Sequence, residues 1–270
     1  MKLSKAVSEI SEAVFPSGIY CIVCGSLIDR SRMYGLCDEC IRKLHWINGR
    51  TCGKCGKALP DEYLGELCYD CMELEHFFTR GFSCLTYGFY ERQIMMDIKY
   101  HGKGDMAVKM GDVLFDRMET LIMAAAKKGI KPFDVVIPVP VSERRRRKRG
   151  YNQAELMTAQ FIKRWKSVDR DGWPLHERNV LERRHETEML RSMNPSERRL
   201  ALKDAFEVKS HKADRVRAKA VLLVDDIYTT GATADACSKA LIEAGAEAVY
   251  LLTLCSGGNR KPEELEKLRD

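Results

Sequence analysis

The sequence predicts an α/β fold with a mostly parallel sheet, preceded by a small cysteine-rich domain. The first observation is the apolar run 221–224, which ends at the acid pair Asp225 and Asp226. The second is the alternation of strand-like and helix-like segments across residues 82–254, which is typical of βα units. The third is the concentration of eight of the eleven cysteines within residues 21–71.

The composition indicates a globular protein. A chain of 270 residues with 45% hydrophobic and 31% charged residues can bury a core and is not expected to be disordered. No apolar run approaches the roughly 20 residues that cross a bilayer, so no membrane span is expected. From Leu3 to Val14, apolar residues recur at helical spacing between polar ones, which predicts a helix over residues 1–17 rather than a signal peptide. We therefore expect a cytoplasmic protein.

The positive charge is concentrated in the middle of the chain. The formal net charge is +6, and residues 142–217 contain 21 Lys and Arg against 12 Asp and Glu. This region precedes the acid pair directly. An anionic partner, either a pyrophosphate or a nucleic acid, is therefore expected.

The clustered cysteines form four Cys-x2-Cys pairs in two repeats that are offset by 31 residues. They are Cys21, Cys24, Cys37 and Cys40, then Cys52, Cys55, Cys68 and Cys71. Four thiolates suit a tetrahedral zinc site and leave no open position for water, so two structural zinc ions are expected. Spacing alone leaves open whether the pairs combine within each repeat or between repeats. A disulfide framework is the alternative, but it suits an exported protein.

The periodicity beyond the cysteines predicts alternating strands and helices. Runs of β-branched and aromatic residues predict strands at 82–90 (a strand or a hairpin), 133–137, 180–181, 220–224 and 247–254. Amphipathic spacing predicts helices at 91–100, 107–127, 152–166, 195–202 and 234–244. Pro138 and Pro140 end the second strand, because proline cannot continue a ladder. This alternation predicts a parallel sheet that is covered on both faces.

A loop rich in threonine and glycine follows the acid pair and leads into a helix. In a parallel α/β sheet, ligands bind beyond the carboxyl ends of the strands, where a helix N-terminus attracts phosphate. Two carboxylates can hold a cis-diol, and loop N–H groups and hydroxyls can hold a phosphate, as in a ribose 5-phosphate. The loop residues are Tyr228, Thr229, Thr230, Gly231, Ala232 and Thr233. The alternative is an ordinary strand-to-helix turn with Thr233 as its N-cap.

This order of strand, acid pair, loop and helix resembles the PRPP loop of the type I phosphoribosyltransferases. The resemblance implies that Asp225 and Asp226 are the catalytic pair that holds the ribose 2′- and 3′-hydroxyls, while the loop holds the 5′-phosphate. It also implies Mg²⁺ as a cofactor that binds with PRPP. A Walker A loop is excluded, because no Gly-Lys-Ser/Thr follows the glycine.

Two basic elements are candidates for contact with the phosphates. Residues 144–149 are six consecutive Arg and Lys after a strand, and we interpret them as a loop in which Arg149 binds an anion. The alternatives are a nuclear-localisation signal and a solvated helix. Lys99 or Lys103 is the second candidate, and the alternative there is a helix end that is capped by Gly102.

Together these motifs resemble the ComF family of phosphoribosyltransferase-like proteins. The matching elements are the zinc-ribbon cysteines, Pro138-Val139-Pro140, Arg149-Gly150-Tyr151-Asn152-Gln153 and the PRPP loop. The resemblance covers residues 19–254 and implies a double zinc ribbon over 18–76 and a type I phosphoribosyltransferase domain over 77–270. The family usually has Gln at the position of Leu190 and Asn at that of Ala201, so acceptor chemistry shared with the family is not implied.

The resemblance implies a PRPP-binding protein that acts in natural transformation. Its implied partners are PRPP, single-stranded DNA and DNA-uptake proteins. Two alternatives remain: a phosphoribosyltransferase that salvages a nucleobase, and a non-catalytic regulator whose nucleic-acid binding responds to PRPP. An enzyme of this kind would be a glycosyltransferase that displaces pyrophosphate from the ribose C1.

Overall fold

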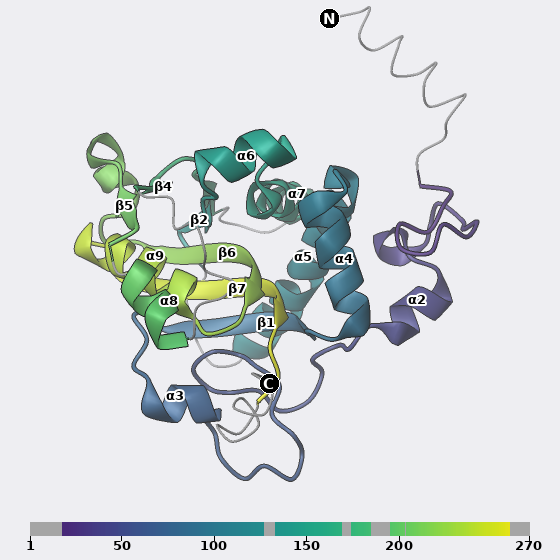
Figure 1. The fold of residues 1–270 in the computed structure, drawn as a ribbon, viewed down its shortest axis with the longest axis horizontal. Helices are drawn as coiled ribbons and strands as arrows, with labels where there is room; N and C mark the ends of the chain where they lie inside the picture. The colour runs from purple at the N-terminus through teal and green to yellow at the C-terminus, as the bar shows by residue number, and fades with distance from the viewer. Residues whose placement is uncertain (1–17, 127–132, 169–173, 185–194, 203, 260–270) are drawn as a thin grey trace, which may run out of the picture. The chain divides into compact units, whose positions relative to one another are not determined.

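The chain forms two compact units in a computed structural model, residues 1–44 and residues 45–270 (Figure 1). The structure describes residues 18–126, 133–168, 174–184, 195–202 and 204–259. The helix expected over residues 1–17 lies outside the described residues. The domain boundaries expected after residues 17 and 76 stay predictions.

The smaller unit has little regular structure. Its elements are the 3-10 helix η1 (Met33–Gly35) and the helix α2 (Asp38–Lys43), which Cys37 caps by accepting a hydrogen bond from the N–H of Cys40. Among its described residues, the buried apolar side chains besides two cysteines are Leu36 and Leu44. A core of this size is too small to stabilise a fold alone, which is typical of domains that a metal holds together.

The larger unit is built around a five-stranded parallel sheet. Its strands are β1 (Arg80–Thr86), β2 (Val135–Pro138), β3 (Leu175–His176), β6 (Ala220–Tyr228) and β7 (Ala248–Ser256). Their order is β1-β7-β6-β2-β3, and all neighbours are parallel. From β6 the chain continues to β7, toward one edge of the sheet, and from β2 it continues to β3, toward the opposite edge. The strand order therefore reverses between β2 and β6, where a crevice opens at the carboxyl ends of the strands.

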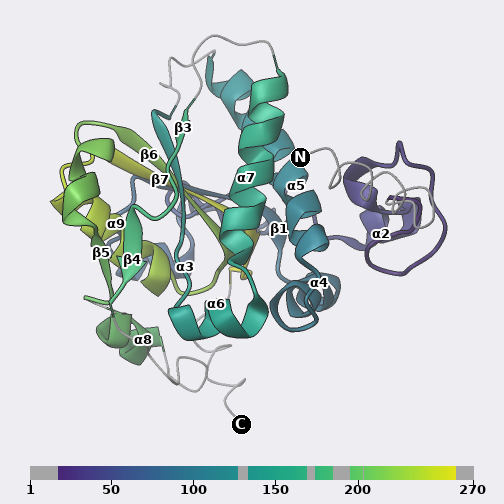
Figure 2. The ribbon, with the colours of Figure 1, turned by 90° about the horizontal axis from the view of Figure 1, so that it is seen from above.

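Helices cover both faces of this sheet (Figure 2). On one face lie α4 (Phe89–Tyr100), α5 (Gly104–Ala126) and α7 (Gln153–Ser167), and on the other lie α8 (Pro195–Leu202) and α9 (Ala232–Glu243). The side chains of β6 alternate between the two layers: Val221 and Leu223 join the core on the α9 side, and Leu222 and Val224 point the other way. All four are fully buried, so both faces of the central strand are covered.

The smaller elements lie outside this sheet. They are α3 (Tyr69–Glu73), α6 (Glu143–Arg149), η2 (Ser210–Arg215) and an antiparallel pair, β4 (Leu181–Arg183) and β5 (Phe206–Val208). Within the described part of the chain, no helix is long and apolar enough to cross a membrane.

The predicted fold class is confirmed: a parallel sheet covered on both faces follows a cysteine-rich N-terminal segment. Strands β3 and β5 were not predicted, and three further details differ from the prediction. The hairpin alternative for residues 82–90 is wrong, because β1 pairs in parallel with β7 and α4 begins at Phe89. Strand β6 continues through the acid pair to Tyr228, because β7 pairs with it as far as Ser256. Residues 143–149 form the helix α6 instead of a loop.

Candidate functional site

The acid pair lies at the carboxyl end of β6, beside the end of β2. Pro138 pairs with Val224, and the N–H of Val139 donates to the Val224 carbonyl at 2.8 Å. Asp225 and Asp226 follow at once. They therefore lie at the point where the strand order reverses, which is where ligands bind in open α/β sheets.

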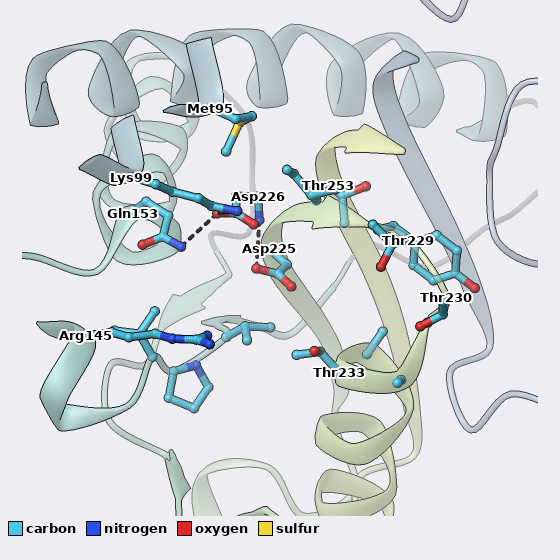
Figure 3. Close-up of a pocket in the computed structure, with 18 of the residues that line it drawn as sticks. Met95, Lys99, Arg145, Gln153, Asp225, Asp226, Thr229, Thr230, Thr233 and Thr253 are labelled. Atoms are coloured by element: carbon cyan, nitrogen blue, oxygen red, sulfur yellow. Dashed lines mark hydrogen bonds and ion pairs between the residues drawn. The ribbon is translucent and has the colours of Figure 1, made fainter. Parts of the chain in front are cut away.

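A cavity of about 330 Å³ opens at this edge (Figure 3). It lies between α4, α6, the start of α7 and the turn from β6 to α9. Of the predicted site residues, it brings together Asp225, Asp226, Tyr228, Thr229, Thr230, Gly231, Ala232, Thr233, Arg149 and Lys99. Segments that lie more than 100 residues apart in the chain thus meet around one space of ligand size.

The loop that is predicted to hold phosphate, residues 228–233, turns sharply into α9. Gly231 is the N-cap and has a φ of 79°, the left-handed region that favours glycine. Thr233 is therefore not the N-cap that the ordinary-turn alternative expected, and its side chain lies beside the cavity with those of Thr229 and Thr230 (Figure 3). Tyr228 is 3% exposed, and its hydroxyl lies 3.4 Å from Nε2 of His76.

The two carboxylates have different surroundings. Oδ2 of Asp226 lies 2.8 Å from Nζ of Lys99 and accepts a hydrogen bond from Nε2 of Gln153 at 2.7 Å. Asp225 accepts from the backbone N–H of Asp226 at 2.8 Å. Burial, together with the neighbouring Asp226 charge, raises the pKa of Asp225 to about 7. The Asp225 carboxyl is therefore protonated below neutral pH and ionised above it.

The basic side of the cavity comes from α4 and α6. Arg149 donates to Oε1 of Gln153 at 3.0 Å and lies over the ring of Tyr100, 5.6 Å from its centroid. Burial lowers the pKa of Arg149, which remains a cation at any ordinary pH. Lys103 pairs with Asp97 at 2.9 Å and is not among the residues that line the cavity, so of the two lysines Lys99 is the one at the site.

Polar residues that the sequence prediction did not name as site residues also line the cavity, among them Arg145 and Gln153. Arg145 reaches into the space opposite Thr233, and Gln153 lies beside Asp226 (Figure 3). A helical interpretation of residues 143–149 would have found Arg145, because residues i and i+4 lie on one helix face and Arg149 was already a candidate. Of the two departures from the family pattern, Ala201 lies on α8 and Leu190 lies outside the described residues.

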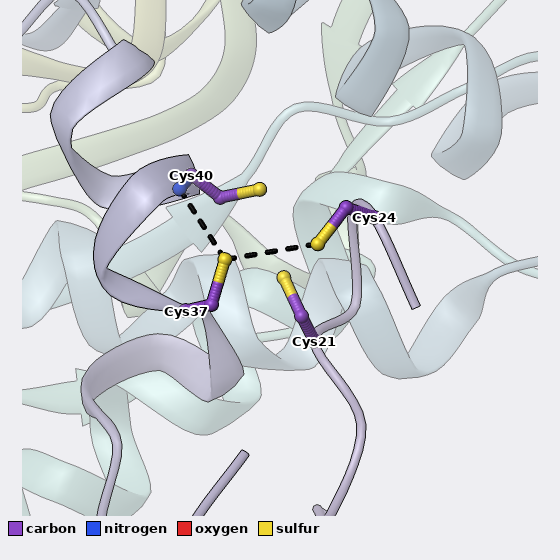
Figure 4. Close-up of side chains that lie close together, drawn as sticks. All are labelled: Cys21, Cys24, Cys37 and Cys40. Atoms are coloured by element: carbon purple, nitrogen blue, oxygen red, sulfur yellow. Dashed lines mark hydrogen bonds between the residues drawn. The ribbon is translucent and has the colours of Figure 1, made fainter. Parts of the chain in front are cut away.

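The first cysteine group assembles within one repeat (Figure 4). The sulfur atoms of Cys21, Cys24, Cys37 and Cys40 all lie within 4.8 Å of one another. Cys24 and Cys37 are 3.7 Å apart, close to the roughly 3.8 Å edge of a tetrahedron with Zn–S bonds of about 2.3 Å. The N–H of Cys40 donates to Cys37, as expected for a thiolate in a knuckle turn. The four residues therefore fit a structural zinc ion.

The second group assembles in the same way from Cys52, Cys55, Cys68 and Cys71. Cys55 and Cys68 are 3.6 Å apart, and the N–H of Cys68 donates to Cys52 at 3.2 Å. The pairing between repeats that spacing left open is thus not the one adopted. The two groups differ in exposure: Cys24 is exposed, whereas all four cysteines of the second group are at most 8% exposed.

Comparison with known proteins agrees with these features. The family model of the double zinc ribbon domain matches residues 10–72. Competence protein F of Haemophilus influenzae is 28% identical over 80% of this chain and 88% of its own length. DNA utilization protein YhgH of Escherichia coli K12 is 24% identical over 82% and 90%, and competence protein ComFC of Bacillus subtilis is 26% identical over 78% and 79%.

Among solved structures, a hypoxanthine phosphoribosyltransferase from Staphylococcus aureus aligns with 57% of this chain and 64% of its own, with 15% identity and a TM-score of 0.30. The fold class is assigned from the strand order and the cysteine groups, not from this superposition. The relatives named for competence span most of both chains. The chain is therefore a homologue of the ComF competence proteins and has a double zinc ribbon at its N-terminal end.

Proposed function

We propose that the cavity binds PRPP together with Mg²⁺, and that the protein acts on single-stranded DNA in natural transformation. The observation that carries the first part is the composition of the cavity wall. An acid pair, a loop at a helix N-terminus that can hold phosphate, and basic side chains that include Lys99, Arg145 and Arg149 line one space. A ribose that carries both a monoester phosphate and a pyrophosphate needs these three kinds of group.

The residues divide the ligand between them. The carboxylates of Asp225 and Asp226 accept hydrogen bonds from the ribose diol, and the phosphate loop, residues 228–233, donates its N–H groups and hydroxyls to the 5′-phosphate. Arg145 and Arg149 face the pyrophosphate. When the Asp226 carboxylate binds the ribose diol, the ammonium group of Lys99 can pair with the negative charge that the ligand brings. Mg²⁺ supplies charge neutralisation for the pyrophosphate oxygens.

The proposed action on DNA is supported by the relatives, whose names refer to competence and DNA utilization. On this chain, the exposed face of α6 adds a basic surface next to the cavity, formed by Arg144, Arg146, Arg147 and Lys148. Arginine and lysine on one short helix suit the backbone phosphates of a single strand. The same helix also supplies Arg145 and Arg149 to the cavity wall.

Calorimetric titration with PRPP and Mg²⁺ tests the binding site. We expect Asp225→Ala/Asp226→Ala to weaken binding by at least about 100-fold, since each charged acceptor contributes about 1.5–3 kcal/mol. Lys99→Met should weaken it by about 10-fold. Two matched controls should bind as the wild type does: Lys103→Met, and Asp214→Ala, whose side chain is 90% exposed. Absence of binding to the wild-type protein would refute the proposal.

Catalysis is tested in the same preparation. Release of pyrophosphate in the presence of a panel of nucleobases identifies a transferase and its acceptor. Binding without release identifies a PRPP sensor, and its affinity for single-stranded DNA should then change with PRPP.

A further inference from the structure

A buried polar network lies beneath the phosphate loop. Nδ1 of His76 lies 3.0 and 2.9 Å from the two carboxylate oxygens of Asp235, on the first turn of α9. Arg199, on α8, donates to Oδ2 of Asp235 at 2.8 Å and to the carbonyl of Thr230 at 2.9 Å. The side chain of His76 is 0% exposed and that of Asp235 is 9% exposed. His76 and Arg199, from two distant segments of the chain, therefore meet at the Asp235 carboxylate, and Arg199 also holds a carbonyl of the loop.

The network constrains the shape of the loop. A buried carboxylate is costly unless it is paired, so a packing in which His76 and Arg199 both pair with Asp235 is strongly specified. The His76 ring also packs closely against Gly231. A Cβ atom on residue 231 would lie 3.0 Å from Cε1 of His76 and 2.7 Å from the Tyr228 hydroxyl. His76 and Arg199 thus hold the two residues, Thr230 and Gly231, at which the chain turns into α9.

The second cysteine group packs against the same network. Lys57, which lies between Cys55 and Cys68, is 4% exposed, pairs with Asp70 and places Nζ 5.5 Å from the centroid of the Tyr228 ring. Phe78 stacks on His76 with centroids 4.8 Å apart and rings 22° from parallel. The four cysteines also share one hydrophobic core with Phe78, Tyr228 and Ala232.

We infer that His76, Asp235 and Arg199 are positioning residues for the phosphate loop, and that through them the metal of the second cysteine group is coupled to phosphate binding. The inference rests on the proposed function of the loop. Metal and phosphate favour the same packed arrangement, so each strengthens the binding of the other by the same factor. The first cysteine group belongs to a different compact unit and takes no part in this coupling.

The test uses the zinc-loaded full chain and ribose 5-phosphate as the probe. Zinc release to a chelator is followed with and without saturating probe, and probe affinity is measured by calorimetry. The Cys24→Ser variant, in which only the second group keeps four thiolates, assigns the two release phases. We expect the probe to slow release from the second group at least about fivefold and to leave release from the first group unchanged.

The variants separate positioning from general stability. His76→Ala and the milder Arg199→Lys should weaken probe binding by about 10-fold and abolish the protection of zinc. Arg199→Lys keeps a cation beside Asp235 but loses the second guanidinium nitrogen, which donates to the Thr230 carbonyl. This variant therefore still tests the inference if His76→Ala does not fold. The control is His45→Ala, since His45 also pairs with a buried carboxylate, that of Glu91, at 3.0 Å.

Two results would overturn the inference in different ways. Wild-type protein that binds the probe without protecting zinc, or an Arg199→Lys variant that retains both properties, refutes the coupling and leaves the proposed function intact. Wild-type protein that binds neither ribose 5-phosphate nor PRPP refutes the proposed function and the coupling together.

Discussion

Asp225 and Asp226 are neighbours in the chain, but they are not equivalent at the site. Asp226 faces Lys99 and Gln153, whereas Asp225 faces the backbone N–H of its neighbour. The pair of acids could be found in the sequence, because two carboxylates at the end of an apolar strand are conspicuous. Their different surroundings could not be predicted, because Lys99 and Gln153 come from helices whose packing no local pattern specifies.

The raised pKa of Asp225 predicts a pH dependence of stability. The ordinary pKa of 3.8 applies to the unfolded chain and about 7 to the folded protein, so between these values the folded state holds a proton that the unfolded state has lost. The contribution of Asp225 to stability is therefore present below pH 4 and falls as the pH rises to 7, by at most about 1.4 kcal/mol per pH unit. Asparagine at this position does not titrate.

Thermal melts of Asp225→Asn and of the wild type between pH 4 and pH 8 measure this effect. We expect the Tm of the variant relative to the wild type to increase steadily up to pH 7 and then to level off. Asp214→Asn, at an exposed position, serves as the control and should show a constant difference. A constant difference for Asp225→Asn as well would mean that the carboxyl is already ionised at pH 5.

At the scale of the element, α6 shows which signals decide a helix. Six consecutive basic residues after a strand were interpreted as an anion-binding loop, with a solvated helix as an alternative. Residues that favour the two ends of a helix are nevertheless present. Ser142 accepts from the N–H of Arg145 at 3.4 Å as an N-cap, and Gly150 ends the helix with a φ of 82°. The capping residues thus indicate this helix better than its interior does, although the sequence prediction did not use them.

The helical form of α6 predicts which of its arginines contact DNA. The exposed Arg146 and Arg147 do not line the cavity, so Arg146→Ala/Arg147→Ala should weaken binding of a fluorescent oligothymidylate and leave PRPP binding unchanged. Each lost phosphate contact should reduce the slope of log affinity against log salt by about 0.7. The control is Lys163→Ala/Lys166→Ala on α7, which removes the same charge from another exposed surface. Equal losses in both variants would indicate a non-specific charge effect.

The ends of strands were predicted less well than their centres. The apolar residues 221–224 identified the middle of β6, but its end depends on pairing: β7 runs alongside as far as Ser256 and holds Asp225 to Tyr228 in extended form. The strand β3 has two residues, and its pairing with β2 depends on the sheet rather than on its own composition. Local pattern therefore predicted β1, β2, β6 and β7 and the helices that cover them but not β3, and tertiary pairing set the limits of the strands.

At the scale of the whole molecule, two repeats with identical cysteine spacing have different structural roles. The spacing predicted both metal sites but could not distinguish them, because the difference lies in what surrounds each one. The first group is in a unit with a small core, whereas the second shares its core with residues of β6, β7 and α9. The predicted boundary after residue 76 would separate that second group from the core that covers it.

Two fragments test where the folding unit begins. Residues 45–270 keep the second cysteine group, and we expect this fragment to hold one zinc ion, to melt cooperatively and to bind PRPP as the full chain does. Residues 77–270 lose the four cysteines and uncover Phe78 and Tyr228, which are 0% and 3% exposed in the structure. This fragment should be insoluble, or soluble with a broad melt and strong binding of a hydrophobic dye, because an uncovered apolar core loses its specific packing. Both fragments lack residues 1–44, so they differ only in residues 45–76, which contain the second group and His76. A cooperative melt and PRPP binding by residues 77–270 would instead establish the boundary after residue 76 and show that the α/β sheet folds without its zinc-binding neighbour.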